Sequence, residues 1–178
     1  MTLLCNDKLR LRPLEPEDLD TLYKWENNPD LWIQGNTLAP YSRFALREYI
    51  AHAHHDIYEL RQLRLLIEQI DDKVVVGIAD LFDFEPHNRR AALGLYIDTP
   101  YQHAGIGRMA LQLMVNYAFS FLQLHQVYVH IQTTNIPCLT LFRKFGFSSV
   151  GILREWAQTP DGFKDVEIFQ LLNSGKGL

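Results

Sequence analysis

The sequence predicts a single α+β domain in which helices flank a mixed, mostly antiparallel sheet. Short apolar segments, several with alternating polar residues, recur along the chain and are typical of strands. Amphipathic segments of helical period separate some of these strands but not all of them, as an antiparallel sheet allows. The 178 residues, 47% of them hydrophobic, suffice for one core and contain no repeat or linker. We therefore expect one domain over residues 1–178.

Seven strands are expected, each bounded by turn residues. In chain order they cover residues 8–13, 64–70, 74–84, 91–97, 127–132, 147–153 and 166–172. The first has Leu9 and Leu11 on one face, as in a half-buried strand. The polar turn Asp71–Lys73 makes a hairpin of the second and third, and Thr159–Gly162 forms the turn between the last two.

Four helices are expected, each with its own start or stop signal. They run from Pro16 to about Glu26, from about Phe44 to Asp56, from Met109 to Leu122 and from Asn135 to Gly146, with irregular structure over residues 30–41. Acidic residues follow Pro16 in the first helix, and Ser42 caps the second. Asn135 caps the fourth, and Gly146 ends it in a left-handed conformation. The stripe of the third that faces the sheet is Leu111, Met114 or Val115, Ala118, and Phe121 or Leu122.

The composition argues against several classes of protein. The formal net charge is -4 and the basic residues are scattered, so no nucleic-acid surface is expected. No apolar run approaches the ~20 residues of a membrane-spanning helix, and the N-terminus lacks the layout of a signal peptide. Cys5 and Cys138 are far apart and form no disulfide framework, and such scarcity of cysteine suits the reducing cytoplasm.

Three histidines, His52, His54 and His55, lie close together in the second predicted helix. A metal site on a helix favours histidines at i,i+4 spacing or a nearby cysteine. These three histidines have neither. We expect a solvated helix face there, and no metal.

The stretch Gln102–Arg108 lies between a strand and a helix. Gly105 and Gly107 have no side chain to prevent close approach of a ligand to the backbone. The first amides of the following helix lack partners within it, and the helix dipole favours an anion there. Because Arg108 adds a full positive charge, we expect an anion such as a pyrophosphate. The alternative is a glycine turn that merely starts a helix.

Two common phosphate-binding loops do not match this stretch. A Walker loop would have Lys-Ser/Thr after Gly107, and the dinucleotide-binding fingerprint would have a third glycine. The spacing Gln-x-x-Gly-x-Gly instead resembles the coenzyme A loop of the GCN5-related N-acetyltransferases (GNAT). Two further motifs of that superfamily are matched, the strand Leu95–Ile97 and the run Asn135–Phe147. The resemblance extends from about Leu9 to Leu172.

This resemblance implies the GNAT fold, whose sheet has a central splay, and an acetyl-CoA-dependent N-acetyltransferase. In that fold the backbone at the splay binds the pantetheine arm as an added strand would. The residues that would bind the co-substrate acetyl-CoA are Leu95, Tyr96, Ile97, Gln102, His103, Ala104, Gly105, Ile106, Gly107, Arg108, Asn135, Cys138, Phe142 and Lys144.

The acceptor is expected to be a primary amine. Trp25–Pro29 and His87–Ala91 resemble the branch that holds spermidine N-acetyltransferases and ribosomal-protein N-terminal acetyltransferases. The resemblance therefore implies a polyamine or a protein N-terminal amine. Where the spermidine enzymes carry carboxylates, however, this chain has Leu38-Ala39 and Ala92, and buried ammonium groups need such partners.

Asp83 and Glu85 are the expected substrate-binding residues. They share a face by strand alternation, and Asp83 matches a position that binds substrate cations in the resembled family. The alternative is that both are only the polar end of a strand.

The proton donor of the reaction is not evident. The resembled family commonly has a tyrosine beside the sulfur, and Phe142 stands there instead. His130 and Asp83 are the catalytic candidates, since histidine ordinarily titrates near pH ~6.5, although a buried, hydrogen-bonded histidine is the alternative for His130. Cys138 lies in the first turn of a helix, where a thiol pKa can fall, but packing against the coenzyme is expected there rather than nucleophilic attack. The thiolate can also leave unassisted.

Two functions remain open. The first is a cytoplasmic N-acetyltransferase in which the amine attacks acetyl-CoA in a ternary complex and the amide of Ile97 polarises the thioester carbonyl. The second is an acyl-CoA-binding module that senses or regulates with little turnover, as Phe142 would explain.

The expected partner is a small-molecule amine or peptide N-terminus, not nucleic acid or a membrane. The resembled enzymes often self-associate, so a homo-oligomer is also to be considered.

Overall fold

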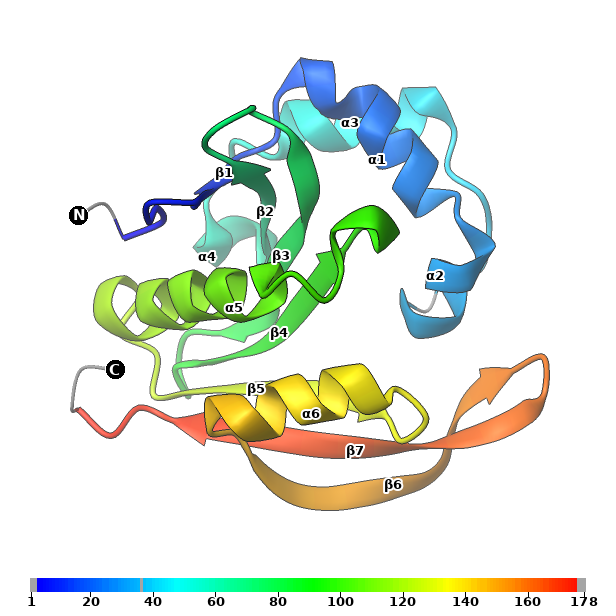
Figure 1. The fold of residues 1–178 in the computed structure, drawn as a ribbon, viewed down its shortest axis with the longest axis vertical. Coiled ribbons are helices and arrows are strands. Elements are labelled where there is room, and N and C mark those ends of the chain that lie inside the picture. The colour runs from blue at the N-terminus through cyan, green and yellow to red at the C-terminus, as the bar shows by residue number, and fades with distance from the viewer. Residues whose placement is uncertain (1–2, 36, 176–178) are drawn as a thin grey trace.

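The computed structural model describes residues 3–35 and 37–175. Its strands form one sheet with the order β1-β2-β3-β4-β5-β7-β6 (Figure 1). The strands are β1 (Leu9–Arg12), β2 (Leu63–Gln69), β3 (Val75–Glu85), β4 (Arg90–Ile97), β5 (Gln126–Gln132), β6 (Ser148–Thr159) and β7 (Gly162–Leu172). Neighbouring strands are antiparallel except β4 and β5, which are parallel. The predicted α+β class and mostly antiparallel sheet are confirmed.

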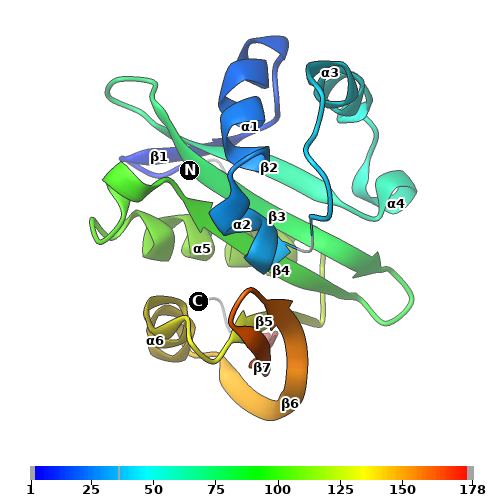
Figure 2. The same ribbon diagram turned by 90° about the vertical axis from the view of Figure 1, so that its right-hand side faces the viewer.

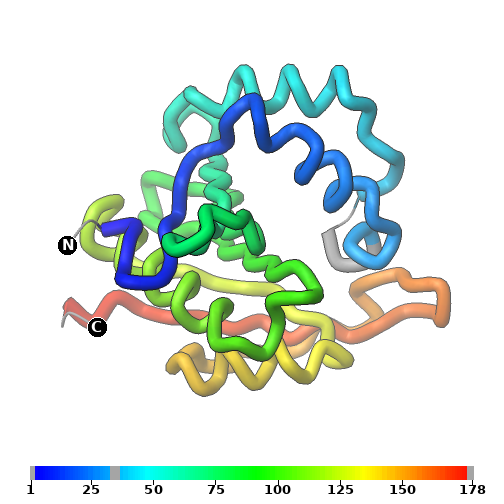
Figure 3. The backbone as a smooth tube through the Cα atoms, turned by 45° about the horizontal axis from the view of Figure 1, so that its top comes forward, coloured from blue at the N-terminus to red at the C-terminus, as the bar shows by residue number. Residues whose placement is uncertain are grey.

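Helices cover both faces of this sheet (Figure 2). α1 (Leu19–Glu26) and α3 (Arg43–His52) lie on one face, and α5 (Ile106–Asn116) and α6 (Ile136–Phe145) lie on the other. The shorter elements are η1 (Pro16–Asp18), α2 (Pro29–Gly35), α4 (Ile57–Leu60), η2 (Thr99–Tyr101) and the π-helical turn η3 (Tyr117–Phe121) that extends α5. The first and last described segments of the chain lie on the side of the molecule opposite the β6–β7 hairpin and α2 (Figure 3).

The hydrophobic core is divided between the two faces. The smaller part joins α1 and α3 to the sheet and contains Leu14, Leu22, Trp25, Leu46, Ile50, Leu66 and Ile78. The larger part lies under α5 and α6. Leu111, Met114 and Ala118 are fully buried in it, as the predicted stripe of α5 requires. Phe121 is 61% exposed, whereas Leu122 packs on the core, so Leu122 completes the stripe.

The prediction of irregular structure over residues 30–41 is wrong in its first part, where α2 forms. Pro29 fits the first turn of a helix, because a proline there loses no internal hydrogen bond. The side chain of Asn28 accepts a hydrogen bond from the amide of Asp30 at 3.1 Å and so satisfies one free donor of that turn. Residue 36 of this segment lies outside the described residues.

The helix predicted over residues 44–56 is also too long. It ends at His52, and Asp56 instead caps α4 by accepting hydrogen bonds from the amides of Tyr58 (2.8 Å) and Glu59 (3.0 Å). An aspartate is favoured at a helix start because its carboxylate binds free amides, and so it interrupts the longer helix. His54 and His55 therefore lie between two helices rather than on one.

A buried ion cluster fastens the N-terminal strand to the sheet. Arg12 of β1 donates two hydrogen bonds to Asp18 at 2.8 Å, and a third to Glu68 of β2. Arg10 also donates to Glu68, at 2.6 Å. Burial alone would raise the pKa of Glu68, but the hydrogen bonds from Arg12 and Arg10 outweigh it and lower that pKa below its ordinary value of 4.5.

We expect Glu68→Gln to change how the stability of the protein depends on pH. A carboxyl whose pKa is lowered by folding stabilises the folded state above its unfolded pKa, and this contribution is lost as pH falls through the folded pKa. Between about pH 5 and pH 3, the wild type should therefore lose more free energy of unfolding than Glu68→Gln does. Urea unfolding at several pH values measures this. The exposed Glu17→Gln is the control, and equal slopes for all three proteins would contradict the prediction.

Candidate active site

The free edge of β4 is the centre of the site. β4 pairs with β5 only from Arg90 to Ala92, and beyond that point the two strands separate. The amide of Asp98 donates to Val76 of β3 at 2.9 Å. Because successive residues of a strand point their amides to opposite sides, the amides of Leu95 and Ile97 point away from β3. They face the gap between β4 and β5, so the predicted central splay is present.

The glycine loop follows directly from this edge. Gly105 has φ +79° and precedes α5, whose first internal hydrogen bond is from Met109 to Gly105. His103 also has a positive φ, so the sign of φ alternates along the loop, as in backbone nests that bind anions. A Cβ at Gly105 would meet no atom within 4 Å. The space beside the loop is therefore open, and the first amides of α5 are free to bind an anion.

Two contacts fix the position of the loop relative to β4. The side-chain amide of Gln102 donates to the carbonyl of Ile97 at 2.9 Å. Gly107 lies against the side chains of Leu95, Ile97 and Leu141. A Cβ added at Gly107 would be 3.5 to 3.7 Å from these three side chains. The free edge and the amides of α5 thus belong to one connected surface that could bind an extended ligand with a phosphate at one end.

The start of α6 borders the gap from the side of β5. Asn135 caps this helix by accepting from the amide of Cys138 at 3.2 Å, which leaves its amide group free to donate. Burial raises the pKa of Cys138 to about 11. The lowering that a helix start can cause is therefore absent here, which agrees with the expectation that Cys138 packs rather than acts as a nucleophile.

Phe142 is only 1% exposed, and its ring meets that of Phe147 edge to face, with centroids 4.9 Å apart. It packs in the core under the sheet and supplies no proton donor. Lys144, two residues later, is exposed.

His130 and Tyr128 lie on the opposite face of β5, the one that also carries α1 and α3. Val127, Val129 and Ile131 are buried, whereas His130 is exposed, so the alternative of a buried histidine is wrong. The rings of Tyr128 and His130 are 5.7 Å apart. Burial, and next the nearby charge of Asp83, raise the pKa of Tyr128. We call this side of the sheet the acceptor face, defined by Arg64, Asp80, Phe82, Gly94, Tyr128 and His130.

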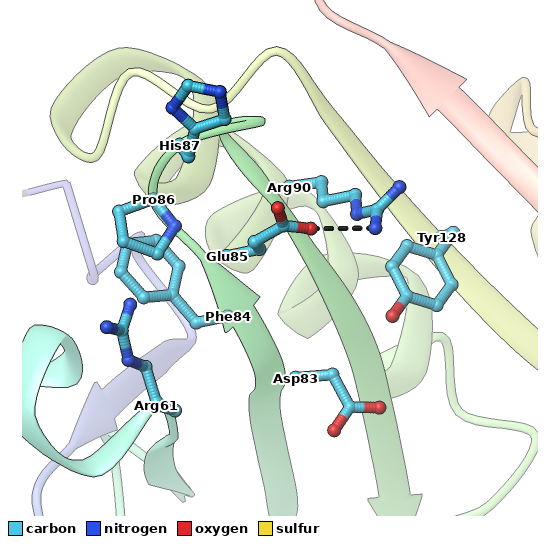
Figure 4. A pocket seen from close by; sticks show the side chains of 8 residues that line it. All are labelled: Arg61, Asp83, Phe84, Glu85, Pro86, His87, Arg90 and Tyr128. Atoms are coloured by element: carbon cyan, nitrogen blue, oxygen red, sulfur yellow. Dashed lines mark ion pairs between the residues drawn. The ribbon is translucent and has the colours of Figure 1, made fainter.

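An open pocket of ≈ 630 Å³ lies where the splay begins (Figure 4). Its lining residues are Arg61, Asp83, Phe84, Glu85, Pro86, His87, Arg90 and Tyr128. Asp83 and Glu85 do face the same pocket, as predicted. The reason is not simple alternation, because a β-bulge interrupts the strand and holds Asp83 at φ +48°. Glu85 is paired with Arg90 at 2.7 Å and accepts from Asn88, so its carboxylate is already occupied.

Sequence reasoning missed the ion cluster that lies deeper on the acceptor face. Arg64 donates to both oxygens of Asp80 at 2.9 Å and to Glu26 of α1 at 2.5 Å. Burial alone would lower the pKa of Arg64, but the charge of Asp80 and its hydrogen bonds raise it. Gly94 lies opposite Asp80 in β4. A glycine inside a strand often marks a close approach, and this was the available signal.

Tyr96 is a further phenol beside the free edge. Its hydroxyl donates to Asp98 at 3.0 Å, and burial together with this hydrogen bond raises the pKa of Tyr96. Its ring meets Trp25 edge to face at 5.3 Å. Tyr96 therefore joins α1 to β4, and its proton is held by Asp98.

Within residues 3–35 and 37–175, no group of three or more His, Cys, Asp and Glu side chains is arranged to hold a metal ion. In the same part of the chain, no helix is long and apolar enough to cross a membrane.

Residues 8–148 match the family model of the acetyltransferase (GNAT) domain. The chain belongs to the GNAT acetyltransferase family. Spermidine N(1)-acetyltransferase of Vibrio cholerae is 27% identical over 172 residues, which cover 95% of each chain.

Solved structures of GNAT relatives are also similar. One is the crystal structure of spermidine N-acetyltransferase from Vibrio cholerae in complex with CoA and spermine. Its TM-score is 0.84 at 27% sequence identity, and the match covers 95% of this chain and 98% of the other chain. A dodecameric structure of the enzyme from the same organism has a TM-score of 0.78 at 26% identity, over 95% of this chain and 96% of its own. The predicted family, GNAT fold and use of acetyl-CoA by an N-acetyltransferase are confirmed.

Proposed function

We propose that this protein transfers the acetyl group of acetyl-CoA to a primary amine by direct attack in a ternary complex. The observation that carries the proposal is the unpaired edge of β4, which continues without a break into the glycine loop and the free amides of α5. The two cysteines, Cys5 and Cys138, are free thiols, which supports the cytoplasm as its location.

The chain's own groups would hold acetyl-CoA along this surface. Amides of the loop Gln102–Arg108 would bind its pyrophosphate, and Leu95–Ile97 would bind its pantetheine arm as an added strand. Asn135 can donate to that arm from the other side of the gap. The amide of Ile97 points into the gap and would stabilise the charge that develops on the carbonyl oxygen. Acetyl-CoA supplies the acetyl group, already activated as a thioester.

The acceptor would enter over the acceptor face, where a polyamine or a protein N-terminal amine are the two classes in question. Asp83 would bind its ammonium group, since an unpaired carboxylate favours a cation. The relatives named as spermidine acetyltransferases support the polyamine class. Glu85 would contribute less than the sequence suggested, because Arg90 and Asn88 already hold it.

His130 would move the proton. It is exposed on the acceptor face beside Tyr128, beyond the point where β5 leaves β4. A histidine there can take a proton from the attacking amine. Phe142 lies in the core on the other face and can do no such chemistry.

The rival function, an acyl-CoA-binding module with little turnover, predicts coenzyme binding without thiol release for any amine.

We expect Gly105→Asp to weaken acetyl-CoA binding by about tenfold or more, or ~1.4 kcal/mol, because it places a negative charge beside the pyrophosphate. Isothermal titration calorimetry measures the dissociation constant. Gly162→Asp is the matched control, since Gly162 also has a positive φ and open space at its Cβ but lies in the β6–β7 turn. An unchanged constant for Gly105→Asp would show that the pyrophosphate binds elsewhere.

We expect His130→Gln to lower kcat by about 10²-fold or more, the usual contribution of a general acid or base. Release of thiol from acetyl-CoA measures the rate, and His125→Gln, an exposed histidine just before β5, is the control. A second variant, Phe142→Tyr, tests the position at which the family commonly has its acid. A large gain in Phe142→Tyr with no loss in His130→Gln would contradict the role of His130.

We also propose that the chain self-associates through β6. This strand lies at the edge of the sheet, paired only with β7, and exposes Val150, Ile152 and Trp156. An apolar edge strand favours pairing with another strand, and one relative is described as dodecameric. Light scattering should give at least twice the chain mass of 20.7 kDa, and Ile152→Lys should lower it. A mass of one chain for the wild type would contradict the proposal.

A further inference from the structure

We infer that Asp98 is a positioning residue for acetyl-CoA. Its carboxylate fixes the direction in which the chain leaves the free edge of β4, and so aligns the two halves of the coenzyme site. The inference rests on the proposed function, in which the pantetheine arm lies along Leu95–Ile97 and the pyrophosphate lies on the loop Gln102–Arg108. Asp98 would act through the backbone on either side of it.

Asp98 is the first residue after the free edge. It follows Ile97, the last residue of β4, and precedes η2, which leads into the glycine loop. The amide of Asp98 donates to the carbonyl of Val76 at 2.9 Å, so the backbone here is still held by β3. Only three residues separate Asp98 from Gln102. A change of backbone direction at Asp98 would therefore move the loop relative to the amide of Ile97.

One oxygen of the carboxylate joins the strand to the turn that follows it. Oδ1 of Asp98 accepts from the amide of Thr99 at 3.0 Å, which caps η2, and from the hydroxyl of Tyr96 at 3.0 Å. A short acceptor side chain that binds a nearby amide fixes the local course of the backbone. Because Tyr96 and Thr99 lie on either side of Ile97, the same atom holds the residues before and after the end of the free edge.

The other oxygen faces α1. Nζ of Lys24 lies 3.3 Å from Oδ2, but Lys24 is 71% exposed, so this ion pair contributes little stability. The side chain of Asp98 itself is only 15% exposed. A carboxylate with so little access to water needs its hydrogen bonds, because losing them would leave its charge unsatisfied. The bonds to Tyr96 and Thr99 therefore hold the backbone in one conformation.

The carboxylate keeps its charge at neutral pH. Burial alone would raise the pKa of Asp98, but the neighbouring groups Tyr96, Trp25 and Lys24 outweigh burial and lower it. Burial and the hydrogen bond to Asp98 raise the pKa of Tyr96. The proton thus stays on the hydroxyl of Tyr96, and Oδ1 is the acceptor of both bonds.

The contacts of Asp98 lie outside the path of the coenzyme. The second anchor of the loop, from the side chain of Gln102 to the carbonyl of Ile97, lies on the edge along which the pantetheine arm would bind. The side chain of Tyr96, in contrast, packs with Trp25 of α1 on the other face of the sheet, at a ring distance of 5.3 Å. The bond between Tyr96 and Asp98 can therefore persist while the arm is bound.

Alignment matters because acetyl-CoA would occupy both halves of the site at once. A ligand with two linked parts binds more tightly than either part, since the second part binds intramolecularly once the first is in place. This gain is lost when the two subsites are not at the separation that the linker spans. Misaligned subsites would nevertheless each bind their own part.

The test compares Asp98→Ala with the wild type for three ligands: acetyl-CoA, ADP, which carries a pyrophosphate, and pantetheine, which carries the arm. We expect the dissociation constant of acetyl-CoA to rise by about tenfold or more, and those of ADP and pantetheine to stay within about twofold. Calorimetry measures the first, and NMR titration measures the two fragments.

Asp165→Ala is the matched control. The Asp165 carboxylate also accepts from one backbone amide, that of Glu155, and from one cation, Arg154, but it lies in the β6–β7 hairpin. All three dissociation constants should be unchanged in this variant. Equal weakening of all three ligands by Asp98→Ala, or unchanged binding of acetyl-CoA, would overturn the inference alone. Failure of the wild type to bind acetyl-CoA would overturn the proposed function and the inference with it.

Two milder variants test the cause and also decide the question if Asp98→Ala does not fold. Asp98→Asn keeps an oxygen in place of Oδ1 and loses the charge that faces Lys24, so binding of acetyl-CoA should stay within about twofold of the wild type. Tyr96→Phe keeps the ring on Trp25 but removes one bond to Oδ1, and should weaken acetyl-CoA binding by about threefold with both fragments unchanged. No effect of Tyr96→Phe, or a loss of tenfold or more in folded Asp98→Asn, would overturn the inference.

Discussion

The separation of β4 from β5 is the constraint on which the site depends. Buried backbone amides need partners, and in a continuous sheet β5 would satisfy those of Leu95 and Ile97. Here β5 turns away after Tyr128, and β4 is held only by β3 on its other side. The larger core keeps β4 rigid, because its side chains pack beneath α5 around Gly107. The result is a fixed row of free donors and acceptors that an extended ligand can complete.

The two faces of the sheet have different tasks beside this gap. On the side of α5 and α6, Phe142 is part of the larger core, and Cys138, Leu95 and Ile97 pack against it. On the other side, Tyr128 and His130 share the acceptor face with charged side chains. Phe142 and His130 therefore lie on opposite sides of the sheet, which is why the proposed proton transfer does not involve position 142.

Two clusters of ion pairs join elements that are distant in the sequence. Arg12 joins β1, β2 and η1 through Glu68 and Asp18, away from the splay. Arg64 joins β2, β3 and α1 in a similar way, but does so next to the free edge. The second cluster therefore fixes α1 over the sheet beside the free edge.

The sequence alone determined those features whose causes lie within a few residues. The caps Ser42 and Asn135, the left-handed Gly146, the strands with alternating residues and the glycine loop were all predicted, because local backbone chemistry specifies them. Only the tertiary structure decided which charged groups are free. Glu26 and Arg64 are 38 residues apart, and no local rule pairs them. The exposure of His130 and the raised pKa of Cys138 likewise depend on which faces the sheet register and the helix packing bury.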